Sequence, residues 1–217
     1  DFAERVYSRA GMIALAVASG LGAALVAASL ALGSEAGLRA AAALVAAVTL
    51  VLYYRQDFGT DGADQMSFMV SITVLVAYVA PAGPVIAQIG LWFLCAQLML
   101  AYVASGASKI ASPIWRTGEA VQGVLSSHTY GNALTRAYLP RSRAAAFIAA
   151  WVIMVGECLL PLALLLEPPW LYAALAVGFS FHISVAVIMG LNAFIWSFGA
   201  AYPAAVYVAL SIKPGLA

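Results

Sequence analysis

Seven long apolar stretches occupy most of this 217-residue chain. They cover approximately residues 11–33, 38–54, 66–80, 86–105, 144–166, 170–189 and 193–212. An apolar run of about 18 or more residues is long enough to cross the hydrocarbon core of a bilayer as a helix. The sequence lacks the alternating segments of roughly ten residues that build a membrane β-barrel. We therefore predict an all-α, polytopic transmembrane helix bundle whose first partner is the lipid bilayer.

The composition agrees with this class and excludes others. Hydrophobic residues make up 65% of the chain and charged residues only 9%, whereas soluble domains carry about 25% charged residues. The formal net charge of +1 gives no basic surface that would favour nucleic acid as a partner. Because no internal repeat, linker or soluble domain is visible, we expect a single membrane domain over residues 1–217.

The segment 106–146 differs from the rest because charged residues and prolines gather in it. We expect it to be interfacial or to re-enter the membrane, with a short helix over Thr117–Leu125 that has Thr117 as its N-cap. We also expect Pro203 to break the seventh span near its middle, because proline removes a helical hydrogen bond.

The orientation follows from the distribution of Lys and Arg on alternate sides of the seven spans. One side collects eight of them, which are Arg5, Arg9, Arg55, Lys109, Arg116, Arg136, Arg141 and Arg143. The other side collects only Arg39 and Lys213. This asymmetry predicts that the N-terminus and the 106–146 segment lie in the cytoplasm.

Lys109, one of only two lysines, stands where the fourth apolar stretch ends. A lysine at this depth is either an anchor that extends its amine to the membrane surface or a group placed for chemistry. A general base must spend time as a neutral amine, and partial desolvation beside Arg116 would favour that form. Spacing alone leaves both interpretations open.

Two further ionisable residues lie in the middle of predicted spans. Each of them can make a structural hydrogen bond between helices. Alternatively, Glu157 is a partner of Lys109 or of His182, and His182 is a proton relay or contacts a cofactor. Haem is not expected, because a bis-histidine site needs two axial imidazoles and the other histidine, His128, lies in a polar loop. The same lack of ligands argues against a metal site.

Five other residues are candidates for substrate binding. Trp115 and Arg116 follow Lys109 closely in the sequence, and Asn192 and Trp196 lie one helical turn apart at the beginning of the seventh span. Asp64 opens the third span, where a carboxylate also gains from the helix dipole.

Three ordered segments resemble the HTTM domain, the membrane domain shared with vitamin K-dependent gamma-carboxylase. Tyr102 to Ile110, followed by Trp115, resembles its Tyr-x-x-(Ala/Ser)-Gly-x-x-Lys-(Leu/Ile)…Trp segment. The stretch from His182 to Pro203 is similar to its His…Met/Leu-x-x-x-x-Phe-x-(Trp/Tyr)…Pro stretch. The charged start with Arg9 and the Gly62-Ala63-Asp64 segment are similar to weaker family features. Together these segments extend over roughly residues 1–212.

The resemblance implies that a reduced quinone is the membrane substrate or cofactor and that Lys109 acts as the base. It further implies that His182 lines the quinol pocket or stabilises charge. It also suggests the inner membrane of a bacterium as the location. Because the 217 residues hold no segment similar to the large extramembrane region that holds the peptide substrate in the carboxylase, we do not expect them to carboxylate a propeptide-bearing protein.

Three functions are therefore open at this point. The chain can be an enzyme that acts on a membrane quinol or lipid-like substrate through Lys109, with Glu157 and His182 in support. Small bacterial HTTM proteins include one needed to mature a secreted peptide toxin, so a maturation factor for a small peptide is the first alternative. A non-catalytic accessory subunit of a larger membrane complex is the second.

Overall fold

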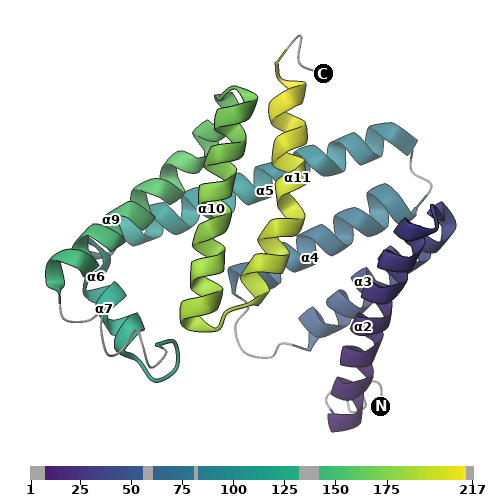
Figure 1. The fold of residues 1–217 in the computed structure, drawn as a ribbon, viewed down its shortest axis with the longest axis horizontal. Coiled ribbons are helices and arrows are strands. Elements are labelled where there is room, and N and C mark those ends of the chain that lie inside the picture. Colours follow the sequence, from purple (N-terminus) through teal and green to yellow (C-terminus); the bar gives the residue numbers. More distant parts are fainter. Residues whose placement is uncertain (1–7, 56–60, 81–82, 132–141, 214–217) are drawn as a thin grey trace. The chain divides into compact units, whose positions relative to one another are not determined.

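The computed structural model describes residues 8–55, 61–80, 83–131 and 142–213, and these residues form helices and no strand. Seven of the helices are long and apolar enough to cross a membrane, which confirms the predicted all-α transmembrane class (Figure 1). They are α2 (Arg9–Ala31), α3 (Glu35–Tyr54), α4 (Gly62–Val74) with η1 (Leu75–Val79), α5 (Gly83–Ala111), α9 (Arg143–Leu159) with η2 (Leu160–Leu165), α10 (Pro168–Met189) and α11 (Ala193–Ser211). Two short helices, α6 (Pro113–Arg116) and α7 (Glu119–Ser126), lie between α5 and α9.

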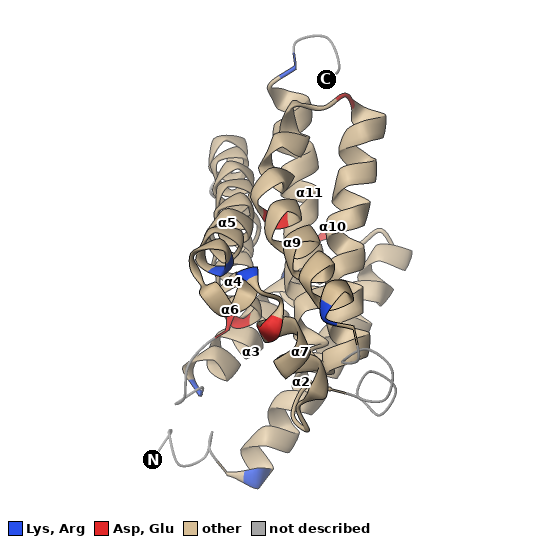
Figure 2. Ribbon diagram, turned by 90° about the vertical axis from the view of Figure 1, so that its left-hand side faces the viewer, with Lys and Arg blue, Asp and Glu red and all other residues tan. Residues whose placement is uncertain are grey.

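The surfaces of these helices suit a bilayer. Large apolar side chains are exposed along them, and Val177 and Val187 of α10 are 72% and 71% exposed. Figure 2 shows that charged residues take up little of the long helices in the described part of the chain. Apolar faces of this kind stay out of water by contacting lipid. The protein is therefore an integral membrane protein.

Short polar side chains begin several of the spans. The hydroxyl oxygens of Ser8, Ser34 and Ser142 accept hydrogen bonds from backbone N–H groups in the first turns of α2, α3 and α9. Asp61 caps α4 and forms a reciprocal capping box with Asp64. Each cap satisfies a backbone donor that the helix itself leaves unpaired. The starts of these spans are therefore determined in part by residues next to them in the sequence.

The chain divides into two compact units, residues 1–94 and 95–217, and α5 contributes residues to both. In the first unit, α2 packs along α3, and α3 packs against α4 and η1. The α2–α3 contact is close at Gly22, where an added Cβ would lie 2.7 Å from Val45.

In the second unit, α10 packs against α11, and η2 contacts α9, α10 and α11. The short helix α7 packs on α9 through buried Val121, which contacts Ala146, Ala150 and Met154. This arrangement attaches the polar segment after α5 to the membrane helices. The buried polar residues described below belong to this unit.

Three local predictions were wrong. The short helix begins at Glu119 rather than Thr117, because Gly118 reverses the chain with a φ of 81° and serves as the N-cap. Helix α11 continues through Pro203, since proline costs one backbone hydrogen bond and packing supports the rest of the helix. Helix α5 extends to Ala111, beyond the predicted end of the fourth span at residue 105, so Lys109 lies in the last turn of the helix.

Two further boundaries also differ from the predictions. The third span begins at Gly62 and ends in the π-helical turns of η1, and the fifth span tightens into a 3₁₀ helix at Leu160, next to Pro161. Arg5, Arg136 and Arg141, which contribute to the predicted charge asymmetry, lie outside the described residues.

Candidate functional site

One face of α5 carries the polar residues of the second unit. Tyr102, Ser105 and Lys109 are spaced three and four residues apart, which places them on the same side of a helix. Helix α9 comes very close beside this face at Gly106, where an added Cβ would lie 2.6 Å from Cys158 Sγ and 2.9 Å from the Met154 carbonyl oxygen. The small glycine therefore lets α9 bring Glu157 to the polar face.

Lys109 and Glu157 form an ion pair in which Glu157 is buried and Lys109 is largely buried. Lys109 Nζ lies 2.7 Å from both Oε1 and Oε2 of Glu157, and the two side chains are only 17% and 7% exposed. The ammonium also donates to Ser105 Oγ at 2.5 Å, so its three N–H groups have three acceptors. Ser105 in turn donates to Glu157 Oε1 at 3.3 Å. Every N–H group of the ammonium therefore has an acceptor and both carboxylate oxygens have donors, which offsets the cost of removing the two charges from water.

Trp115 completes the surroundings of Lys109. Its ring lies with the centroid 5.3 Å from Lys109 Nζ, a cation–π distance. Trp115 packs partly buried against the apolar cluster around Val121 and Met154. Trp115, a candidate for substrate binding, therefore lies beside Lys109, and its indole packs against residues of α7 and α9.

A second polar cluster surrounds Tyr102. Its hydroxyl lies 2.6 Å from His182 Nε2 on α10 and 2.6 Å from the Tyr202 hydroxyl on α11. His182 is 3% exposed and lies against the ring of Phe198, with a centroid distance of 4.2 Å. Within the described part of the chain, His182 Nδ1 has no hydrogen-bond partner. Side chains from α5, α10 and α11 therefore meet at the Tyr102 hydroxyl.

Helix α5 connects the two clusters. Tyr102 and Lys109 are seven residues apart, or about 10 Å along a helix axis. One cluster offers a cation and a carboxylate, and the other offers two phenols and an imidazole, so together they can bind, donate and accept protons in an apolar surrounding. The structure brings Lys109, Glu157, His182 and Trp115 into this one unit.

The other substrate-binding candidates lie elsewhere. Arg116 is exposed and donates to the backbone oxygen of Ile110 at 3.1 Å. Asn192 is the N-cap of α11, where its side chain makes no capping hydrogen bond, and Trp196 is 76% exposed. Arg116, Asn192 and Trp196 thus make no contact with the buried pair that the structure records.

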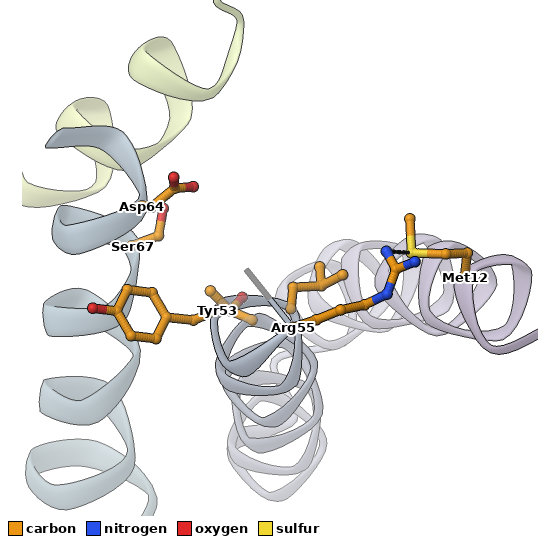
Figure 3. Close-up of a pocket in the computed structure, with 7 residues that line it drawn as sticks. Met12, Tyr53, Arg55, Asp64 and Ser67 are labelled. Atoms are coloured by element: carbon orange, nitrogen blue, oxygen red, sulfur yellow. Dashed lines mark hydrogen bonds between the residues drawn. The ribbon is translucent and has the colours of Figure 1, made fainter. Parts of the chain in front are cut away.

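Asp64 belongs to the first unit, where it lines a pocket of about 340 Å³ (Figure 3). The other lining residues are Met12, Thr49, Leu52, Tyr53, Arg55 and Ser67. Since Lys109 and His182 do not line it, this pocket is not the chamber that the resemblance suggests for them. It is a separate feature of the fold.

Sequence reasoning assigned no role to Tyr102, Ser105 or Tyr202. Tyr102 and Tyr202 stand within the segments that resemble the HTTM domain, and Ser105 stands between Tyr102 and Lys109. The spacing of Tyr102, Ser105 and Lys109 on one helical face was a usable signal. The partners on α10 and α11 had no comparable signal, because they come from distant parts of the chain.

Comparison with known proteins adds no relative to this description. No family model matches the chain, no curated protein matches it, and no solved structure matches it. Within the described residues, no three His, Cys, Asp or Glu side chains gather as a metal site would require.

Proposed function

We propose that the protein is an HTTM-type membrane enzyme that removes a proton from a hydroxyl group of a quinol or lipid-like substrate, with the Lys109–Glu157 pair as its acid–base group. The observation that carries this proposal is the burial of that ion pair inside a membrane protein, on the helical face that also holds Tyr102. Ionisable residues in membrane helices are costly and commonly functional. An apolar contact would join α5 to α9 at a lower cost in desolvation.

The pair can act as a base because it contains one shared proton. Transfer of that proton from Lys109 to Glu157 leaves a neutral amine and a protonated carboxyl group. The amine then accepts the hydroxyl proton of the substrate and becomes an ammonium again. The products are the substrate oxyanion, the Lys109 ammonium beside it and protonated Glu157, so the cation remains next to the new negative charge.

The second cluster gives this site a way to hold and orient polar groups. Tyr102 contacts both His182 and Tyr202 at 2.6 Å, so its hydroxyl is fixed from two sides. The aromatic rings around His182 provide an apolar surrounding in which a neutral imidazole can stabilise developing charge. A quinol combines an apolar ring with acidic hydroxyl groups, which is the chemistry that such a mixed surrounding suits.

The proposed setting is the inner membrane of a bacterium, with the N-terminus in the cytoplasm. The positive-inside rule supports this orientation, because Arg9, Arg55 and Arg143 flank spans on the proposed cytoplasmic side. Reporter fusions after Lys213 and within the α7 segment test it. The fusion after Lys213 is expected to report the outer side, and the fusion in the α7 segment is expected to report the cytoplasm.

The enzymatic proposal is tested by assaying the purified protein with hydroquinones under air and following quinone formation by absorbance. Proton removal gives the hydroquinone anion, which dissolved oxygen oxidises to the quinone while the oxygen is reduced to hydrogen peroxide. Lys109→Arg is the most informative variant, because arginine keeps the cation and the ion pair but cannot lose a proton. We expect its rate to fall by about 100-fold or more, which is the usual contribution of general acid–base catalysis. Lys213→Arg is the matched control, since it makes the same change at the only other lysine.

Two outcomes would contradict the proposal. Full activity of folded Lys109→Arg together with loss in Lys109→Ala would show that charge matters and that Lys109 is not the base. Activity that survives both substitutions would remove this site from catalysis. That second result would favour the alternatives of an accessory subunit or a peptide-maturation factor.

A further inference from the structure

The hydroxyl of Tyr102 contacts two polar groups but carries one proton. It lies 2.6 Å from His182 Nε2 and 2.6 Å from the Tyr202 hydroxyl oxygen. Tyr102 can donate to only one of these atoms, so the other group has to donate to Tyr102. A neutral imidazole likewise carries its proton on one of its two nitrogens. The direction of the hydrogen bonds through Tyr102 therefore determines which nitrogen of His182 is protonated.

Two observations indicate that Tyr102 donates to His182. The distance of 2.6 Å is shorter than the range of about 2.7–3.2 Å for N–H donors to oxygen, whereas O–H donors make shorter bonds. In this direction Tyr202 donates to Tyr102, and only the proton on His182 Nδ1 has no acceptor among the described residues. In the opposite direction, the Tyr202 hydroxyl proton and His182 Nδ1 would both lack a partner there. Both observations favour a proton on Nδ1.

Close packing of α10 and α11 holds this arrangement. Gly178 lies one turn before His182 on α10, and a Cβ added to it would lie 2.8 Å from the Tyr202 hydroxyl oxygen. The Tyr202 ring packs on Phe179 with a centroid distance of 5.7 Å. Tyr102 itself is only 3% exposed. Because position 178 has no side chain, the Tyr202 hydroxyl can approach α10 and reach Tyr102.

We propose that Tyr102 is a positioning residue that fixes His182 in its Nδ1–H tautomer and thereby makes Nδ1 a hydrogen-bond donor for an acceptor oxygen of the substrate. Nε2 is occupied by Tyr102, so Nδ1 is the ring nitrogen left for a ligand. A buried N–H group without an acceptor is unfavourable, and a bound oxygen atom removes that penalty. The contact with a substrate oxygen rests on the function proposed above, whereas the tautomer itself does not.

The surroundings of His182 define the chemistry of the ligand. The rings of Phe181, Phe194 and Phe198 lie with their centroids 5.5, 5.9 and 4.2 Å from that of the imidazole. A molecule that reaches the buried Nδ1 displaces apolar side chains, so it has to be apolar next to its oxygen atom. An N–H donor binds an oxyanion more strongly than a neutral oxygen, and it cannot accept the proton of a hydroxyl group. The donor tautomer therefore favours the quinol anion and the quinone carbonyl over the quinol hydroxyl.

Nuclear magnetic resonance of the full chain with nitrogen-labelled histidine tests the tautomer. The chain has two histidines, and His128→Gln removes the other signal. We expect the His182 proton on Nδ1 in the wild type. Tyr102→Phe removes the donor and keeps the ring, so it should give a mixture of the two tautomers. The control is Tyr207→Phe, which removes a hydroxyl group of α11 for which the structure records no contact with His182 and should leave the tautomer unchanged.

A short-chain quinone added to the same labelled protein tests the ligand. It should shift the Nδ1 signal of wild-type His182, and Tyr102→Phe should weaken its binding about tenfold, the equivalent of one hydrogen bond. In the hydroquinone assay, Tyr102→Phe should lower kcat about tenfold with little change in KM, because the donor acts on the oxyanion that forms during the reaction.

Several results would overturn this proposal. A wild-type His182 protonated on Nε2 would do so, and so would an unchanged tautomer in Tyr102→Phe. A quinone that binds without shifting the Nδ1 signal would remove the contact with the substrate. The acid–base function fails by a different result: if Lys109→Arg keeps full activity while His182 shows the expected tautomer and response to quinone, the role of Tyr102 stands and Lys109 is not the base.

Discussion

Replacing Lys109 by methionine removes the cation of the buried pair and keeps most of the side chain's length. Among the described residues, Glu157, with a side chain 7% exposed, would then retain only the 3.3 Å hydrogen bond from Ser105. Breaking a buried ion pair by removing one partner costs about 3–5 kcal/mol. Methionine and lysine have similar helix propensities, so α5 itself should contribute little to this loss.

The double variant Lys109→Met/Glu157→Leu separates the energy of the pair from the packing of its side chains. With both charges gone, no buried charge lacks a partner, and we expect a stability within about 1–2 kcal/mol of the wild type. Glu157→Leu alone should cost less than Lys109→Met, because Lys109 lies two residues before the end of α5 and can extend its amine toward water. The expected coupling energy is about 3 kcal/mol or more.

The assay is reversible unfolding of the four proteins in mixed micelles, followed by far-UV circular dichroism and converted into a double-mutant cycle. Neutral hydrogen bonds between membrane helices average about 0.6 kcal/mol in such cycles. A measured coupling near that value would refute the description of Lys109 and Glu157 as a charged pair. Additive effects of the two single substitutions would refute the contact itself.

Three other substitutions test the packing and the capping of the helices. Gly106→Ala should destabilise the protein by about 1–3 kcal/mol in the same unfolding assay, because its Cβ would lie 2.6 Å from Cys158 Sγ. Gly156→Ala is the control, since there is open space around Gly156, and it should be neutral or stabilising by up to about 1 kcal/mol. Asp61→Ala should lower the free energy of unfolding by about 1 kcal/mol, because it removes the Asp61 side of the capping box with Asp64. Amide hydrogen exchange should then increase in the first turn of α4. Unchanged exchange in that turn would contradict the role of Asp61 as a cap.

The membrane class and the number of spans could be predicted because hydrophobic length is a property of each segment alone. Boundaries were harder to predict where a single residue decides them. Glycine at position 118 supplies a backbone conformation with φ of 81° that a composition argument does not detect. Pro203 was expected to break α11 but lies within it, because neighbouring helices compensate for a missing hydrogen bond that would end an isolated helix.

The candidate site could be predicted in part. Lys109, Glu157 and His182 stood out because charged and titratable residues are rare in membrane spans. Their pairing depends on tertiary contacts between α5, α9 and α10, which sequence spacing does not specify. Trp115 was predicted from its closeness to Lys109 along the chain, whereas Asn192, Trp196 and Asp64 were chosen for their places at helix ends.

Because both polar clusters include residues from the same face of α5, the number of residues between Tyr102 and Lys109 determines how the two clusters are placed. A helix turns by about 100° per residue, so one residue inserted between Ser105 and Lys109 would swing the lysine away from Glu157 while leaving Tyr102 beside His182. Substitutions on the lipid-facing surface cannot produce that change. An insertion or deletion within the eight residues from Tyr102 to Lys109 should therefore disrupt the two clusters far more than substitutions of the surrounding side chains.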